Sequence, residues 1–429
     1  MQVSRRSLLL SAGAVAGTGA AVAPVATSAA AGPDKAPPRS APGRVRTLNG
    51  RSLPWRLVDG FKEFHLVAGE FEHEFAPGCR AKCWGYNGST PGPTIEAVEG
   101  DRVRILVTNN LPEPTSVHWH GLLLPNGMDG VSGLTQAPIG VGETWSYEFT
   151  LRQNGTCMYH PHADELTQLA FGMMGLFIVH PRVPHEPACH ADFAFMLHNY
   201  ALHPGSFRPD PSVMTEFDLW TFNSKVFPAI EPVDVRLGER VRLRIANLSM
   251  FNHPIHLHGH RFVVTGSDGG RWAQATWRPE TTEIIGVGQT RDIEFIADNP
   301  GDWPLHCHMS HHTMNAMGHG IPSPVGVDRA ALGQPLRSLL PGYEPMGDNG
   351  MYEHDLHASM GHMQGPVNTL PMAAGPGPFG TIAMGGMMTL VRVRAGIAGV
   401  DPGWYDGVPR AQRVVAPAAD AGAAAVPAG

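Results

Sequence analysis

One unit of sequence occurs twice in this chain, and this duplication limits the fold more than any other feature. PTIEAVEGDRVRILVTNNLP (93–112) is echoed by PVDVRLGERVRLRIANLSM (232–250), and in both a turn precedes apolar residues at every second position. Each copy is followed by a His-X-His-Gly (118–121 and 256–259) and by a second His-X-His (160–162 and 306–308). Each unit has roughly the 140 residues, the short strands and the Gly/Pro turns expected of a β-sandwich. The chain is therefore expected to be all-β, with two β-sandwiches in tandem.

The composition agrees with a turn-rich β protein. The chain contains 51 glycines and 39 prolines, and only 16% of its residues are charged. Its net charge of -7 gives no reason to expect nucleic acid as a partner. The 23 histidines are an unusual number and indicate metal binding.

The domain boundaries are expected to follow the repeats and the changes in composition between them. They define an export signal (1–31), a linker (32–44), a first domain (45–182), a second domain (183–328) and a tail rich in Met, His, Gly and Pro (329–429). Within the tail, 329–340 is a helix candidate, 388–394 is expected to return to the second sandwich as a strand, and the end is expected to be disordered.

The N-terminal segment has the features of an export signal. Arg5 and Arg6 precede an apolar stretch and small residues near Ala29 and Ala31. SRRSLLL resembles the twin-arginine signal, and an ordinary secretory signal is the alternative. The apolar stretch is too short and too rich in Ala and Gly to span a membrane, and no other window approaches that length. The protein is therefore expected to be periplasmic or extracellular.

The five cysteines leave the disulfide pairing open. If Cys307 has another role, four cysteines remain: Cys79, Cys83, Cys157 and Cys189. They allow three full pairings, and buried free thiols are an equal alternative. Cys79 and Cys83 are poor partners if they lie on one extended strand, because a separation of roughly 13 Å is beyond the reach of a disulfide.

The HCH motif predicts two metal sites on opposite sides of one strand. Neighbouring residues of a strand point to opposite faces, so Cys307 points away from His306 and His308. His256 and His258 share a face by the same parity and can join the latter pair. The backbone of Cys307 would then link two metal sites through a few bonds, which is a short covalent path for an electron.

A second set of ligands is expected around Cys307. His253 has the parity that lets it join Cys307, and His312 and Met317 follow at five-residue intervals. One thiolate, two imidazoles and one thioether are the ligand set of a blue copper site. Soft sulfur ligands favour copper over calcium or magnesium, and zinc gains little from a Met.

The first unit has no thiolate at the corresponding position, because Pro161 stands where the second unit has Cys307. Pooling both units gives eight histidines: His118, His120, His160, His162, His256, His258, His306 and His308. Eight imidazoles are too many for one metal ion and suit a cluster of three copper ions.

These motifs, in this order over residues 45–327, resemble those of the multicopper oxidase family, which includes laccases and copper-resistance oxidases. The resemblance implies two tandem cupredoxin-like Greek-key β-sandwiches and four copper ions per protomer. The matching ligands are His118 and His256 for type 2 copper, His120, His160, His162, His258, His306 and His308 for the type 3 pair, and His253, Cys307, His312 and Met317 for type 1. It also implies the two-domain branch, a homotrimer with type 1 copper in domain 2 and trinuclear clusters between subunits.

One carboxylate is a candidate for proton delivery. Asp129 in NGMDGVSG resembles an acidic residue that many family members keep near the trinuclear cluster, where reduction of O₂ to water consumes protons. The alternative is a turn Asp before Gly. Some members carry a Glu between HCH and the next ligand His, and this chain has His311 at that place.

Several nearby residues have ordinary interpretations. His260, His311 and His319 are expected at the surface or in hydrogen bonds around the ligands. FGMMG (171–175) is expected to pack in the core, because Met fills irregular gaps. The tail segments MYEHDLHASMGHM (351–363) and MGGMM (384–388) either collect Cu(I) with soft donors or belong to a low-complexity linker.

The sequence thus predicts an oxidoreductase that uses O₂ as acceptor and oxidises a small reducing substrate or metal ion, with Cys307 and Asp129 in catalytic roles. Phenols, Cu(I) and Mn(II) are all open as the electron donor. One alternative is a non-enzymatic copper-binding or resistance protein. Another is a copper nitrite reductase, in which the type 1 ligands would lie in the first domain.

Overall fold

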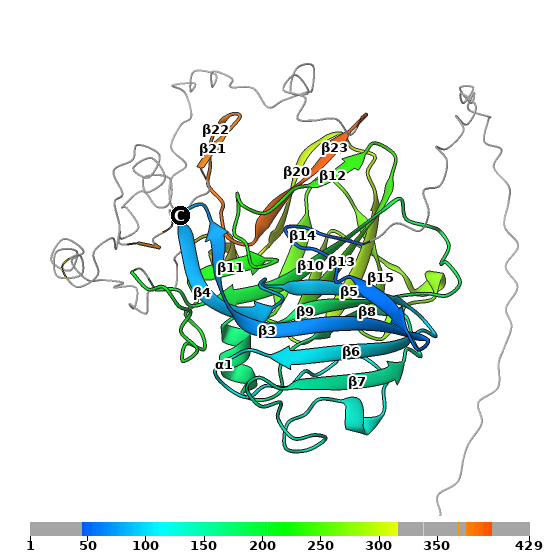
Figure 1. Cartoon of the computed structure of the whole chain (residues 1–429). Coiled ribbons are helices and arrows are strands. Elements are labelled where there is room, and N and C mark those ends of the chain that lie inside the picture. The colour runs from blue at the N-terminus through cyan, green and yellow to red at the C-terminus, as the bar shows by residue number, and fades with distance from the viewer. Residues whose placement is uncertain are drawn as a thin grey trace, which may run out of the picture. The chain divides into compact units, whose positions relative to one another are not determined.

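The computed structural model describes residues 45–203, 205–315, 338, 367–368, 370 and 375–396, and strands dominate among them (Figure 1). The expected signal and linker (1–44), Met317, His319 and the tail segment 351–363 lie outside the described residues. Within the described ranges, no helix has the length and hydropathy needed to span a membrane.

Two sheets built from residues 55–180 share one apolar core. The first contains β2 (Trp55–Val58), β3 (Phe61–Ala76), β6 (Arg102–Asn109) and β7 (Thr144–Thr150) in this order, with β4 (Cys79–Tyr86) paired to β3. The second contains β5 (Gly92–Val98), β9 (Gly175–His180) and β8 (Gly155–Tyr159). The 3-10 helix η1 (Asn126–Met128) and the helix α1 (Glu165–Ala170) lie in the connections. Buried Trp119, Phe64 and Phe177 pack in the core between the sheets.

One eight-stranded and one five-stranded sheet form the second sandwich. One contains β1 (Arg46–Thr47), β10 (Ala191–Tyr200), β13 (Arg240–Asn247), β19 (Thr290–Ile296), β15 (Phe262–Ser267) and β16 (Gly270–Arg271), with β11 (Leu219–Phe222) on β10 and β17 (Arg278–Glu280) on β15. The other contains β12 (Val233–Arg236), β23 (Met388–Arg394), β20 (Gly301–Cys307), β14 (His253–Leu257) and β18 (Thr282–Ile285). The short elements are η2 (Gln274–Thr276), η3 (Ser310–Thr313) and the hairpin of β21 (Gly375–Gly377) and β22 (Gly380–Ile382).

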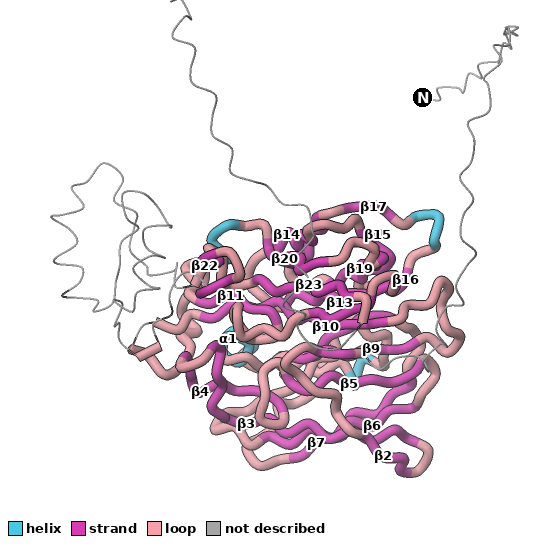
Figure 2. The backbone as a smooth tube through the Cα atoms, turned by 90° about the horizontal axis from the view of Figure 1, so that it is seen from above, coloured by secondary structure: helices cyan, strands magenta, loops and turns pink. Residues whose placement is uncertain are grey.

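The repeated sequence occupies equivalent strands in the two sandwiches. β6 pairs in parallel with β3 and antiparallel with β7, and β13 pairs in parallel with β10 and antiparallel with β19. In Figure 2 the strands β3, β6 and β7 lie together, and β10, β13, β20 and β23 lie together. The same pairing around both copies agrees with a duplicated unit.

The equivalent strands β6 and β13 differ in how deeply their polar side chains are buried. β6 alternates between buried and partly exposed residues, whereas β13 is buried along almost its whole length. Strand β8 of the first sandwich contacts β13, and the Thr156 hydroxyl lies 2.9 Å from Nη1 of Arg244 and 2.8 Å from Oδ1 of Asp292. The charged side chains of β13 are therefore enclosed between the sandwiches.

Two segments from outside the second repeat join the second sandwich. Arg46 and Thr47, at the start of the expected first domain, pair with β10. At 388–394, where a returning strand was expected, the chain forms β23 between β12 and β20. This position matters for the site, because β20 carries the HCH motif.

The described residues include all five cysteines, and every one is a free thiol. Cys79 and Cys83 both lie on strand β4, which is the condition under which they were expected to be poor disulfide partners. Met173 and Met174 of FGMMG have no exposed surface and pack in the cores, as expected.

Candidate metal centres

The register of β14 and β20 directs the motif residues to two faces. Ile255 lies opposite Cys307, and His256 lies opposite His306. Opposite residues of an antiparallel pair project to the same face, and their neighbours project to the other. Cys307 is fully buried in the core, while His256 is only half-buried. The two sides of the strand therefore receive different sets of side chains, as the alternation predicts.

One set gathers around the thiol of Cys307. Its Sγ atom lies 3.6 Å from Nδ1 of His253 and 3.4 Å from Nδ1 of His312, and the two Nδ1 atoms are 3.1 Å apart. All three side chains are buried. A thiol and two imidazoles that converge in a dry core offer the three in-plane ligands of a blue copper site. The residues present therefore fit copper.

Neighbouring groups hold the two imidazoles in this orientation. The Ser249 hydroxyl lies 2.7 Å from Nε2 of His253, so Nδ1 of that ring is left facing Cys307. The indole of Trp220 stacks on His312, with ring centroids 3.6 Å apart and planes inclined by 19°. Nε2 of His312 is buried without a hydrogen-bond partner.

Burial sets the protonation of these ligands in the metal-free protein. It raises the pKa of the Cys307 thiol to about 12, although the backbone of Met309 acts in the opposite direction. It lowers the pKa of His253 to about 3 and that of His312 to about 2, so both rings are neutral. Because a metal requires the thiolate, binding at this site releases the Cys307 proton.

The four histidines of the first unit form a second group. Donor atoms of His118, His120 and His160 all lie within 4.8 Å of one another, and the ring of His162 is 5.6 Å from that of His118. Backbone hydrogen bonds between His118 and His160 hold the two motifs together. Nδ1 of His118 also lies 2.8 Å from the carbonyl oxygen of Asp129, so Nε2 is left for a metal.

The four histidines of the second unit form a third group. Nε2 of His258 lies 3.0 Å from Nε2 of His306, and the ring of His256 is 4.7 Å from His258 and 5.5 Å from His308. Nδ1 of His306 faces the Cys307 carbonyl oxygen at 2.8 Å, which again leaves Nε2 outward.

Within the described residues, the two four-histidine groups do not contact each other. Among the residues that the structure describes, no hydrogen bond or ring contact joins a histidine of the first group to one of the second. His308 is exposed and His256 and His258 are half-buried, so the second group is open on one side. Each group is half of the eight-histidine set that the sequence predicts.

Two carboxylates lie beside the first group. Oδ1 of Asp129 is 3.4 Å from Nδ1 of His118. Oxygens of Glu165 lie 3.5 Å from Nδ1 of His160 and 3.8 Å from Nε2 of His162. The sequence reasoning missed Glu165. Its position was the available signal, because it follows HPH by the same three residues that separate His311 from HCH.

The remaining histidines take secondary positions. His260 is buried against Phe295 and Trp303, and its Nδ1 lies 3.2 Å from the carbonyl oxygen of His258. His311 is exposed next to the ring of His312. Met317, expected to complete the blue copper set, lies outside the described residues.

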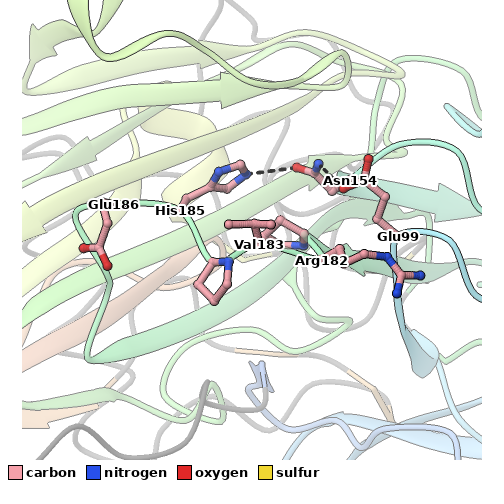
Figure 3. A pocket seen from close by; sticks show the side chains of 8 residues that line it. Glu99, Asn154, Arg182, Val183, His185 and Glu186 are labelled. Carbon is pink, nitrogen blue, oxygen red and sulfur yellow. Dashed lines mark hydrogen bonds between the residues drawn. The ribbon is translucent and has the colours of Figure 1, made fainter.

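An open hollow of ≈ 680 Å³ lies along segment 181–186 (Figure 3). Asn154 bridges its wall, with Oδ1 3.0 Å from Nε2 of His185 and Nδ2 3.1 Å from Glu99. None of the predicted copper ligands lines it.

Family models of the multicopper oxidases match residues 69–184 and 205–325, together more than half of the chain. The chain belongs to the multicopper oxidase family. Membership implies copper as the metal of these sites. The two sandwiches are accordingly cupredoxin-like.

This multicopper oxidase is similar to several other proteins. It is 26% identical over 289 residues to a probable nitrite reductase-hydroxylamine oxidoreductase fusion protein of Kuenenia stuttgartiensis, over 64% of this chain and 32% of that protein. It is 41% identical over 125 residues to copper resistance protein A of Pseudomonas syringae pv. tomato, over 29% of this chain and 20% of that protein. The chain thus matches only 32% or less of these curated relatives. The crystal structure of blue copper oxidase from Nitrosomonas europaea matches at 26% identity with a TM-score of 0.58, over 77% of this chain and 85% of that chain.

Proposed function

We propose that the protein couples one-electron oxidation of a reducing substrate to the four-electron reduction of O₂ to water. The position of Cys307 between two groups of imidazoles carries the proposal. Its thiol faces His253 and His312, and its backbone continues directly into His306 and His308 of the other group. The two groups are therefore joined through a few covalent bonds.

The protein would hold four copper ions per protomer. The proposed ligands are His253, Cys307 and His312 for type 1, His118 and His256 for type 2, and His120, His160, His162, His258, His306 and His308 for the type 3 pair. Bound copper supplies one-electron transfer at the Cys307 site and the reduction of O₂ at the histidines.

Residues around the ligands have roles of their own in this proposal. Ser249 and Trp220 fix the ligand imidazoles and keep water away from the thiol. Asp129 and Glu165 lie beside the first histidine group, where they would relay the protons that reduction of O₂ to water consumes.

We propose a homotrimer in which the first group of one subunit meets the second group of the next. The lack of a hydrogen bond or ring contact between the two groups, among the described residues of one chain, supports this arrangement. Mixing subunits offers a direct test with two variants, His120→Ala and His258→Ala, each inactive alone. Mixed oligomers regain activity if each cluster spans two subunits, and they stay inactive if it is built within one chain.

The electron donor is proposed to be a phenol or Cu(I), with Mn(II) open as well. The similarity to copper resistance protein A supports the inclusion of Cu(I). A non-enzymatic copper carrier has little need of eight clustered histidines. We further propose export by the twin-arginine route to the periplasm or the cell exterior, on the basis of SRRSLLL.

The Cys307→Ser variant tests the oxidase. The copper-loaded protein is expected to be blue and to consume O₂ with phenols or Cu(I), and Cys307→Ser should lose both properties. Cys79→Ser is the matched control, because it changes a buried thiol in a different core cluster from Cys307 and should keep both properties. Oxygen uptake that survives Cys307→Ser would contradict the proposal.

Nitrite reduction is a second candidate, favoured by the similarity to the Kuenenia stuttgartiensis protein. Pro161 argues against it, because it leaves the first sandwich without the thiolate that such an enzyme carries there. Nitrite supplied anaerobically in place of O₂ should leave the reduced protein unoxidised.

A further inference from the structure

A segment of the tail crosses back over residues 307–315, which we call the ligand loop because it carries Cys307 and His312. We call residues 384–388 the return strap. Four hydrogen bonds tie the strap to the ligand loop, from Gly385 N to Thr313 O at 2.6 Å, from Gly386 N to Asn315 Oδ1 at 3.1 Å, from Met387 N to His312 O at 2.9 Å, and from Cys307 N to Met387 O at 3.1 Å. The strap therefore bonds to the backbone of two proposed type 1 ligands, His312 and Cys307.

Gly386 permits this close approach. Its φ is +52°, and a Cβ atom there would lie 2.4 Å from the carbonyl oxygen of His312. Phe227 N also bonds to Gly386 O at 2.9 Å. The strap is thus held by hydrogen bonds to Phe227 as well as to the ligand loop.

The register of β20 and β23 gives the direction of the next side chain. His306 lies opposite Met388, and the bond from Cys307 N to Met387 O continues the ladder by one residue. Opposite residues project to the same face, with Cβ atoms about 4.5–5.5 Å apart. Met387 therefore projects with Cys307 into the core, and Met388 projects with His306.

Burial agrees with this direction. Met387 has no exposed surface and belongs to the same core cluster as Cys307. Its thioether is a soft donor, and the dry site beside it presents a thiol and two imidazoles. The ligand that these three residues lack is a weakly bound thioether.

We propose that Met387 supplies the thioether of the type 1 copper site in place of Met317. This inference rests on the proposed function. Met317 satisfies the spacing after His312, but Met387 stands opposite the thiolate residue in the described structure. The weak bond runs from a sulfur lone pair to the metal, so no proton or electron is transferred.

Substitutions at Met387 should move the properties of the copper site in two directions. Leu conserves the volume and removes the donor, so Met387→Leu should raise the type 1 reduction potential and alter the blue absorption band. Gln is a stronger axial donor, so Met387→Gln should lower the potential. Met388→Leu is the matched control, because Met388 is a buried neighbour of Met387 that projects to the opposite face. This variant should leave the reduction potential and the blue absorption band unchanged.

Three measurements on the copper-loaded full chain decide the matter: the visible spectrum, the electron paramagnetic resonance spectrum and the reduction potential. The fourth is the unfolding of the metal-free protein. Unfolding unchanged by Met387→Leu, together with a shifted potential, supports the assignment. Shifts on Met317→Leu but not on either Met387 variant overturn the assignment and leave the proposed function standing. A copper-loaded unmodified protein without a blue band would overturn both.

Discussion

The carboxylate of Asp129 lies 3.4 Å from Nδ1 of His118, and the backbone carbonyl oxygen of Asp129 lies 2.8 Å from the same atom. The turn that brings them together needs the next residue to be glycine, since a Cβ atom on Gly130 would lie 1.8 Å from the carbonyl oxygen of Val117. Asp129 is therefore both a turn residue and a neighbour of a proposed ligand. The two interpretations of this position are compatible.

Asp129→Asn should slow oxygen reduction without changing the type 1 site. The amide keeps the turn, and the backbone bond to His118 does not depend on the side chain, but the variant cannot deliver a proton. Loss of a positioned proton donor lowers kcat on the order of 10²-fold or more. Steady-state O₂ uptake and the blue absorption band are the two measurements. A variant with full kcat would leave Asp129 as a turn residue alone.

Glu165→Gln should lower kcat for oxygen reduction to a similar extent, because Glu165 contacts two proposed type 3 ligands, His160 and His162. Its neighbour Asp164 provides the control. Asp164 has φ +51°, which Asn also tolerates, so Asp164→Asn keeps the local fold and should retain kcat. Equal losses in Glu165→Gln and Asp164→Asn would point to a disturbed helix α1 instead of proton delivery.

Gly386→Ala should separate the return strap from the ligand loop. The added Cβ atom meets the carbonyl oxygen of His312, and alanine is strained at φ +52°. The free energy of unfolding of the metal-free protein should fall by about 1–3 kcal/mol. The blue absorption of the loaded protein should weaken with it.

Gly396→Ala is the control for the strap. Nothing lies within 4 Å of a Cβ atom at Gly396, and its φ lies outside the left-handed region. Urea unfolding and copper titration of both variants make the comparison. If both variants match the unmodified protein, the strap does not support the ligand loop.

The features that the sequence predicted well are local ones. Alternation along a strand depends only on backbone geometry, so HCH was enough to separate Cys307 from His306 and His308. The duplicated motifs likewise indicated two β-sandwiches, because matching patterns of apolar residues form matching strands. The grouping of His253 with Cys307 followed from parity in the same way.

The features that the sequence left undetermined depend on contacts between distant segments. Spacing along the chain pointed to Met317 for the thioether, whereas the position of Met387 opposite Cys307 depends on the pairing of β23 with β20. The contact of Glu165 with the histidines depends on where α1 begins. The burial of β13 depends on β8, which packs over its charged residues. None of these contacts leaves a periodic signal in the sequence.

The buried ion pairs of β13 yield a prediction about stability. Glu294 has no exposed side-chain surface and accepts hydrogen bonds from Arg240 at 2.9 Å, from Arg242 at 3.1 Å and from Arg271. Glu294→Gln leaves buried guanidinium charges without their partner, so the free energy of unfolding should fall by roughly 3–5 kcal/mol. Glu280→Gln is the control, because Glu280 is partly exposed and lies 4.0 Å from the exposed Arg278. This substitution should lower the free energy of unfolding by under about 1 kcal/mol.

The pKa of Glu294 predicts how the difference in the free energy of unfolding between the unmodified protein and Glu294→Gln changes with pH. Burial alone would raise the pKa of Glu294, but the Arg271 hydrogen bond and the charges of Arg242, Arg271 and Arg240 lower it from 4.5 to about 2. A lowered carboxylate pKa stabilises the folded state fully above the unfolded value and loses that contribution as pH falls through the folded value. The gap between the unmodified protein and Glu294→Gln should therefore be constant above pH 4.5 and narrow toward pH 2. Urea unfolding at a series of pH values measures the gap, and a gap that does not narrow in acid would show that the charge of Glu294 is not its source.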